Sequence, residues 1–194
     1  MLSIILPNHL EPQIHDFIAQ VEERLPVCEI IISCDSESKG KGWAIREALN
    51  HAKGDLIATL DGDGEIPARM LLRLLPFMED FDVCVGSKRI GNSPLRRKVM
   101  TRLTRFWFKL LFGLKQDSQT GIKLFRRSAL EALEWNWESN GFIYDVEVLS
   151  RLQDKGFKIV EVPIECDIKR QVSFKTIFKI FGESLWLRYR LLFR

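Results

Sequence analysis

The sequence has few cysteines and no long apolar run, and these absences exclude several classes of protein. Only four cysteines occur among 194 residues, and no two form a C-x-x-C pair. We therefore expect reduced, mostly buried thiols rather than disulfides or a zinc site. No run approaches the ~20 apolar residues of a membrane-spanning helix, so none is predicted. Because the chain opens on a strand-like run rather than a basic and apolar leader, we expect it in the cytoplasm.

Acidic residues are missing from two long segments of an otherwise ordinary globular composition, with 46% hydrophobic and 28% charged residues. Residues 83–116 contain nine lysines and arginines and no acid, and residues 168–194 contain seven with Glu183 as the one acid. Both segments are also rich in aromatic and aliphatic residues. This combination favours an anionic membrane surface over a nucleic acid as partner. The alternative is a pair of core-packing helices with solvated basic faces.

Apolar runs alternate with helical periodicity along the first half of the chain. This alternation predicts one α/β domain with a mostly parallel sheet. The expected strands are residues 3–6, 29–33, 55–60, 83–85 and 158–162, and the expected helices are 14–21, 43–52, a helix after Pro67, 95–114, 145–155 and 174–194.

The segment Asp61-Gly62-Asp63-Gly64-Glu65 follows an expected strand directly. Ligands bind to open α/β sheets at the carboxyl ends of their strands. Carboxylates there suit Mg²⁺ or Mn²⁺, either of which would neutralise a diphosphate leaving group. The competing interpretation is a simple turn, because Asp-Gly pairs are common in turns.

Two further clusters are open to more than one interpretation. Lys39-Gly40-Lys41-Gly42 precedes a helix, so its amides and cations could hold phosphate, or it could be a solvated basic turn. Asp145 and Glu147 stand at a helix start, where acids usually just favour the helix dipole. The functional interpretation makes Asp145 a general base or an orienting group for an acceptor.

Taken in order, these segments resemble family 2 glycosyltransferases of the GT-A fold, specifically the branch similar to dolichol-phosphate mannose synthase. The resemblance covers nearly the whole chain. The best match is the segment 117–126 (DSQTGIKLFR) against D-x-x-S-G-F-[RK]-x-[FY]-R. Further matches are Pro7 with Glu11, Asp35 with Ser36, Lys41 with Gly42, Asp61 with Asp63 and Glu65, segment 86–89, Phe142 with Asp145 and Glu147, segment 161–164, and Arg170 with Ser173.

The resemblance implies a GT-A domain over residues 1–167 and a basic, amphipathic, membrane-interfacial segment over residues 168–194. It implies a Mg²⁺ or Mn²⁺ cofactor and a role for each matched residue. These roles are catalysis by Asp63 and Asp145; donor binding by Pro7, Glu11, Asp35, Lys41, Asp61 and Asp63; phosphate or acceptor binding by Ser87, Lys123, Arg126, Arg170 and Ser173; and metal binding by Asp61, Asp63 and Glu65.

By this resemblance the chain is expected to be an inverting transferase. It would move a sugar from a GDP- or UDP-sugar to a polyprenyl or dolichyl phosphate, at the cytoplasmic face of a membrane and with a possible membrane-protein subunit. One departure is that only residues 37–39 separate Ser36 from Gly40, where the family has a helix and a strand. Alternatives are a non-catalytic GT-A-like module, a transferase with a hydroxyl acceptor, and a nucleotide-sugar pyrophosphorylase, although the last lacks its glycine-rich loop near the N-terminus.

Overall fold

The computed structural model describes residues 1–7, 18–19, 21–23, 28–33, 39–61, 65–88, 95–141, 143–166 and 174–193, without the side chains of residues 95–98, 174, 175 and 177. Within these residues one six-stranded sheet forms, in the order β2-β1-β3-β5-β4-β6. Its strands are β1 (Leu2–Pro7), β2 (Cys28–Ser33), β3 (Leu56–Leu60), β4 (Val83–Lys88), β5 (Ile122–Arg126) and β6 (Ile159–Ile164).

Strand β5 runs against the other five. It pairs antiparallel with β3 on one side and β4 on the other, whereas β1 pairs parallel with β2 and β3, and β4 with β6. The predicted mostly parallel sheet is therefore confirmed, but neither strand β5 nor its antiparallel direction was predicted. Because β5 begins where its neighbours end, the residues before Ile122 reach the same sheet edge as Asp61.

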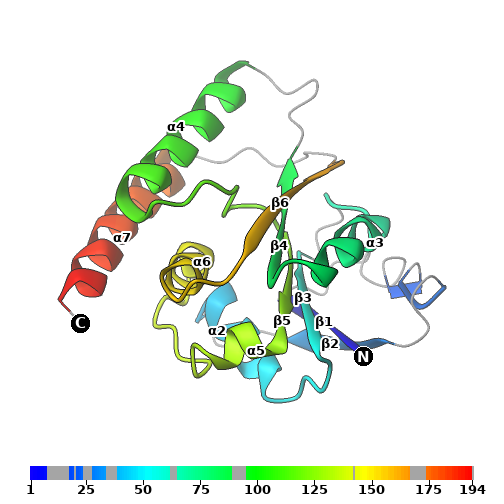
Figure 1. Ribbon diagram of the computed structural model, residues 1–194. Coiled ribbons are helices and arrows are strands. Elements are labelled where there is room, and N and C mark those ends of the chain that lie inside the picture. The colour runs from blue at the N-terminus through cyan, green and yellow to red at the C-terminus, as the bar shows by residue number, and fades with distance from the viewer. Residues whose placement is uncertain are drawn as a thin grey trace.

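Helices cover both faces of the sheet (Figure 1). Helices α2 (Lys41–Leu49), α5 (Arg127–Glu131) and α6 (Tyr144–Asp154) lie on one face, and α3 (Arg69–Leu74) with the 3₁₀ helix η1 (Leu75–Glu79) lies on the other. Neighbouring residues of β1 point to opposite faces, so Ile5 enters the first core and Ile4 the second.

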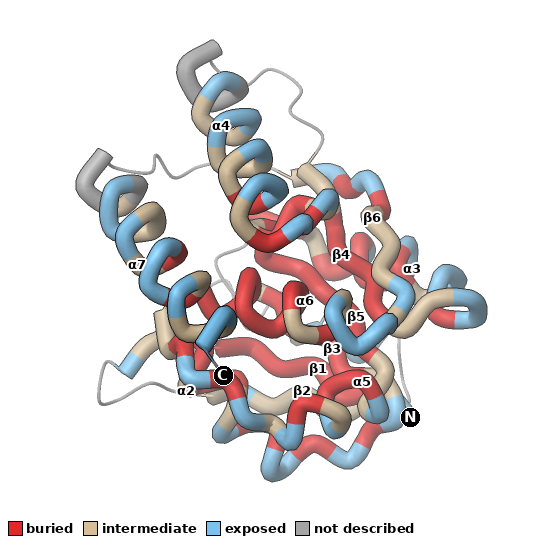
Figure 2. The backbone as a smooth tube through the Cα atoms, turned by 60° about the vertical axis from the view of Figure 1, so that its left-hand side comes forward, coloured by how far each residue is buried: buried red, intermediate tan, exposed pale blue. Residues whose placement is uncertain are grey.

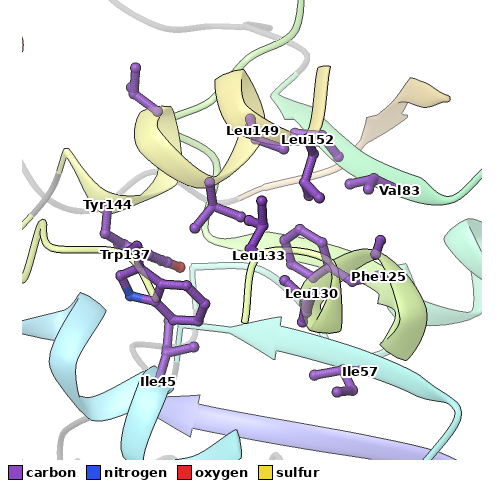
Figure 3. Packing of buried hydrophobic residues seen from close by; sticks show 14 of the residues in the cluster. Ile45, Ile57, Val83, Phe125, Leu130, Leu133, Trp137, Tyr144, Leu149 and Leu152 are labelled. Atoms are coloured by element: carbon purple, nitrogen blue, oxygen red, sulfur yellow. The ribbon is translucent and has the colours of Figure 1, made fainter. Parts of the chain in front are cut away.

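The first core contains a buried tryptophan that connects two helical segments. Trp137 packs beside Ile45 and Tyr144 (Figure 3). Its indole N–H donates to the carbonyl oxygen of Gly42 at 3.0 Å, so the polar end of this large side chain is satisfied. The contact ties the segment before α6 to the start of α2.

Helices α4 (Leu95–Phe112) and α7 (Phe174–Leu192) lie side by side at the border of this core (Figures 1 and 2). Trp107 joins them, because its Nε1 donates to Ser184 Oγ at 2.8 Å and its ring meets Phe181 edge-on at 4.9 Å. Phe108 and Leu187 anchor the two helices in the first core. Within the described parts of the chain, every helix is too short or too polar to cross a bilayer.

Candidate functional site

Asp61 leaves β3 at the carboxyl edge of the sheet and meets the first residue of α2. Its Oδ1 lies 2.6 Å from Lys41 Nζ, and its side chain is 36% exposed. Burial acts to raise the pKa of Asp61, but the ammonium groups of Lys41, Lys123 and Lys88 outweigh it and hold the pKa below its ordinary value. Asp61 is therefore an ionised group in a cationic setting at the edge where α/β sheets bind ligands.

The two glycines around Lys41 allow α2 to approach the segment before α6. A Cβ on Gly40, which has φ +109°, would lie 2.4 Å from the carbonyl oxygen of Asn140, and a Cβ on Gly42 would lie 2.4 Å from that of Ser139. Gly42 N–H donates to Asn140 O at 2.7 Å. The glycines thus serve close packing, and the lysine between them reaches Asp61.

Lys123 and Asp145 form a buried ion pair behind this edge. Lys123 Nζ lies 2.7 Å from Asp145 Oδ1, and the two side chains are 1% and 7% exposed. The same Nζ donates to the carbonyl oxygen of Thr120 at 2.6 Å. Burial lowers the pKa of Lys123 and Lys41 adds to this effect, while Asp145 opposes it. Lys123 is therefore a buried group that connects Asp145 with the carbonyl oxygen of Thr120, in the turn that precedes β5.

Polar groups around this pair are buried as well. Burial, together with the nearby charges of Asp145 and Asp61, raises the pKa of the Tyr144 phenol well above its ordinary value, so the hydroxyl keeps its proton. Ser118 Oγ, Thr120 Oγ1 and Ser139 Oγ are buried and have no hydrogen-bond partner among the described residues. Buried hydroxyls of this kind are usually satisfied by a ligand or by water.

Glu147 holds the segment that precedes α6. It is buried, and its carboxylate accepts hydrogen bonds from the N–H groups of Glu138 at 3.1 Å and Ser139 at 2.8 Å. Of the two acids at the start of α6, Glu147 fixes the preceding segment, while Asp145 pairs with Lys123.

The expected metal ligands are described in part. Asp61 lies at the sheet edge, Glu65 is buried with Oε2 4.0 Å from Lys88 Nζ, and Asp63 lies outside the described residues. Among the residues described, no group of three or more histidine, cysteine, aspartate or glutamate side chains converges. The donor set is nonetheless carboxylate oxygen, which fits Mg²⁺ or Mn²⁺.

The other expected site residues fall into three groups. Buried Pro7 ends β1 and half-buried Ser87 lies near the end of β4, so both are at the same edge as Asp61. Arg126 is not brought there. Four expected residues lie outside the described part of the chain: Glu11, Asp35, Arg170 and Ser173.

Arg126 corrects the sequence-based expectation of a phosphate contact. It pairs with Leu56, at the opposite end of β3 from Asp61, because β5 is antiparallel. Its guanidinium donates to the carbonyl oxygens of Phe81, at 3.3 Å, and Met78. The structure therefore assigns Arg126 to holding η1 and the chain that follows it.

Sequence reasoning found Glu161 only as part of a motif and missed its contacts. Its Oε2 accepts a hydrogen bond from Asp117 N–H at 2.8 Å and another from Arg105 Nη2 at 2.8 Å. Glu161 thus ties the turn that precedes β5 both to β6 and to α4. Lys88, the partner of Glu65, was not assigned a role either, and only the fold brings these two residues together.

Comparisons with known proteins agree with this geometry. The chain is 28% identical to the glycosyltransferase AglD of Haloferax volcanii over 178 residues, 88% of this chain but 28% of that protein. It is 30% identical to the undecaprenyl-phosphate mannosyltransferase of Micrococcus luteus over 138 residues, 68% of this chain and 57% of that protein. The chain thus spans between about a quarter and somewhat over half the length of these relatives.

A solved structure shows the fold of the chain, and a family model shows its family. The glucosyl-3-phosphoglycerate synthase of Mycobacterium tuberculosis, crystallised with phosphoglyceric acid, superposes with a TM-score of 0.74 at 16% identity, over 97% of this chain and 79% of that one. The expected GT-A type of α/β fold is confirmed. The model of glycosyl transferase family 2 matches residues 30–133. The chain belongs to glycosyl transferase family 2.

Proposed function

We propose that the chain transfers a sugar from a nucleotide-diphosphate sugar to a polyprenyl phosphate. The cluster at the carboxyl edge of the sheet supports this activity, because it sets Lys41, Lys88 and Lys123 among the carboxylates of Asp61 and Glu65. The name of the undecaprenyl-phosphate mannosyltransferase, to which the chain is 30% identical, supports the lipid acceptor.

A divalent cation is part of this proposal. Asp63, with Asp61 and Glu65, would hold Mg²⁺ or Mn²⁺, and the ion would neutralise the diphosphate that leaves when the sugar is transferred. Solved structures of the mycobacterial glucosyl-3-phosphoglycerate synthase include one with Mn²⁺ and UDP-glucose. In this chain the lysines around Asp61 supply further positive charge for donor phosphates. Either a GDP-sugar or a UDP-sugar fits this chemistry.

The burial of Asp145 and its ion pair with Lys123 are the observations that favour a phosphate acceptor. A hydroxyl acceptor must lose a proton, so its transferase needs a base within hydrogen-bond reach. Asp145, which the sequence suggests for that role, is buried and in contact with the ammonium group of Lys123. A lipid phosphate is already anionic near neutral pH and can attack the anomeric carbon directly, with inversion in a single displacement. Arg170 and Ser173 are proposed contacts of that phosphate.

The helix pair α4 and α7 would carry the enzyme on the cytoplasmic surface of a membrane. Much of the backbone of both helices is coloured as exposed in Figure 2. The exposed large apolar residues are Val99, Leu103, Phe106 and Leu110 on α4, and Phe178, Leu185, Trp186, Tyr189 and Leu192 on α7, with Phe193 directly after it. Arg102, Lys109 and Lys179 are exposed on the same helices. Apolar faces edged by cations suit an anionic lipid surface, and a membrane-protein subunit is an additional proposed partner.

One experiment tests the proposal as a whole. The purified chain is incubated with undecaprenyl phosphate, Mn²⁺ or Mg²⁺, and a panel of UDP- and GDP-sugars, and the lipids are analysed by mass spectrometry. A glycolipid that is lost with Asp63→Ala and with EDTA supports the proposal and identifies the sugar. Nucleotide binding without any product would instead favour a different acceptor or a non-catalytic module.

A further inference from the structure

The turn that leads into β5 packs directly on the side chain of Asp61. Asp61 N–H donates to the carbonyl oxygen of Gly121 at 2.8 Å, so the two residues face each other across the sheet edge. A Cβ placed on Gly121 would lie 2.3 Å from Oδ2, 2.7 Å from Cγ and 3.0 Å from Cβ of Asp61. The three nearest atoms thus all belong to Asp61, and its carboxylate fills the space that a side chain at position 121 would need.

The backbone of Gly121 does not itself require glycine. Among the described residues, the glycines with positive φ are Gly40, Gly113 and Gly156. Gly121 therefore has a backbone conformation that other residues adopt without strain. The contact with Asp61 is then the reason, within the described structure, why a glycine is needed at this position.

Three contacts hold the turn before β5 and the Asp61 carboxylate in place. Glu161 Oε2 accepts a hydrogen bond from Asp117 N–H at 2.8 Å, and Lys123 Nζ donates to Thr120 O at 2.6 Å, so the turn is fixed at both ends. On the far side of Asp61, Lys41 Nζ lies 2.6 Å from Oδ1. The Asp61 carboxylate is therefore held between α2 and the turn.

We propose that Gly121 is a positioning residue for Asp61. Because position 121 lacks a side chain, the Asp61 carboxylate rests on the turn and faces Lys41, in the orientation used to bind the nucleotide-sugar donor. The position of the carboxylate follows from the structure of this chain alone. Its consequence for donor binding rests on the proposed function.

The first test is structural and needs no ligand. Crystal structures of the unsubstituted chain and of Gly121→Ala are compared. Gly182→Ala is the control because, in the described part of the chain, no atom beyond its own helix backbone and chain neighbours lies within 4 Å of a Cβ at position 182. The expected result is an Asp61 carboxylate turned away from Lys41 in Gly121→Ala, with β3 and β5 still paired. An Asp61 side chain in the same place in all three structures would overturn the proposal.

The second test measures binding of UDP and GDP, each with Mn²⁺, by isothermal titration calorimetry. Gly121→Ala should weaken binding by about 100-fold, the scale of a misplaced binding group, while Gly182→Ala has no effect. If neither nucleotide binds to the unsubstituted chain, the proposed function fails. The crystallographic comparison still decides the role of Gly121 in that case.

A double-mutant cycle separates positioning from a structural role of Gly121. In an Asp61→Gly background, adding Gly121→Ala should weaken binding by no more than about threefold and should leave Tm unchanged, because all three side-chain atoms of Asp61 that obstruct position 121 are gone. Should Gly121→Ala alone fail to fold, folding of the double variant would support the same contact. Equal losses in both backgrounds, or failure of both to fold, would overturn the proposal.

Discussion

Lys123 Nζ lies 2.7 Å from Asp145 Oδ1, and both side chains are almost completely buried. Removing one partner of such a pair leaves an uncompensated charge in the interior. Lys123→Met should therefore lower the free energy of unfolding by about 3–5 kcal/mol, measured by urea denaturation at pH 7. The double variant Lys123→Met/Asp145→Leu should recover much of this loss. If the double variant were as unstable as the single one, the stability would depend on packing rather than charge pairing.

Asp145→Asn distinguishes the two classes of acceptor. If the acceptor is a phosphate, the change should lower kcat by less than about tenfold, because no proton has to be removed from the attacking oxygen. A hydroxyl acceptor that depends on Asp145 as its base would instead lose about 10²–10⁴-fold. The measurement is kcat with saturating undecaprenyl phosphate, at a temperature where far-UV circular dichroism shows the variant folded.

Most of the fold follows from local sequence patterns. Alternating apolar strands and amphipathic helices predicted the α/β layers, and the position of Asp61 after a buried strand predicted that it lies at the carboxyl edge of the sheet. Strand β5 was not among the expected strands, and its antiparallel direction was not predictable in this way either, because apolar periodicity does not show the direction of a strand in the sheet. The resemblance treated segment 117–126 as one motif, whereas the structure places its start at the same sheet edge as Asp61 and its end at the opposite edge.

Long-range contacts account for the rest of the site. The pairing of Lys41 with Asp61, and of Lys88 with Glu65, depends on which strands are neighbours and on how close α2 comes to the sheet. Nothing in the local sequence marks these as pairs. The sequence left both a phosphate-holding loop and a solvated basic turn open for the glycines beside Lys41, and their contacts with Ser139 and Asn140 show a packing role that only the folded chain reveals.

Arg126→Met tests the assignment of Arg126 to structure rather than catalysis. Activity should stay within about twofold of the unsubstituted enzyme, because Arg126 lies at the edge of the sheet opposite Asp61. The free energy of unfolding should fall by about 1–3 kcal/mol, since the carbonyl oxygens of Met78 and Phe81 lose their donor. Steady-state kinetics and urea denaturation on the same preparation check both parts. A loss of donor affinity with unchanged stability would return Arg126 to the phosphate-binding set.

Glu29 joins β2 to β1 and to the segment before β3, and it gives a pH dependence of stability. Its Oε1 accepts hydrogen bonds from Ser3 Oγ and Lys53 N–H, each at 2.5 Å. Burial acts to raise the pKa of Glu29, but these bonds and the backbone N–H of Gly54 outweigh it, so the net pKa lies below the ordinary 4.5. The ionised carboxylate therefore stabilises the fold above pH 4.5, and that contribution is lost as the pH falls through the lower folded-state pKa.

The corresponding variant is Glu29→Gln, which cannot ionise. At pH 7 the free energy of unfolding of this variant should be about 1 kcal/mol lower than that of the unsubstituted chain. The difference should shrink as the pH falls below 4.5, where both states of the unsubstituted chain become protonated at this position. Thermal or urea unfolding between pH 7 and pH 3 measures the difference. A difference in the free energy of unfolding that stays constant between pH 7 and pH 3 would show that the hydrogen bonds of Glu29 do not depend on its charge.

The exposed aromatic residues of α4 and α7 give a prediction about membrane attachment. Phe106, at 65% exposure, and Trp186, at 58%, lie on the outward sides of the two helices. Transfer of one such side chain into a lipid interface contributes about 1.5–3 kcal/mol. Phe106→Ser and Trp186→Ser should each weaken binding to vesicles of phosphatidylcholine and phosphatidylglycerol by about 10- to 100-fold in sedimentation assays.

The matched control for these variants is Phe77→Ser, because Phe77 is also an exposed aromatic residue but lies in η1, on the other face of the sheet. It should sediment with vesicles as the unsubstituted chain does. Binding should also weaken as salt rises, since screening reduces the attraction between exposed lysines and arginines and the anionic lipid. Equal loss in all three variants would indicate non-specific hydrophobic adsorption. Vesicle binding unchanged by Phe106→Ser and Trp186→Ser would instead assign this apolar face to a protein partner, which a membrane subunit could provide.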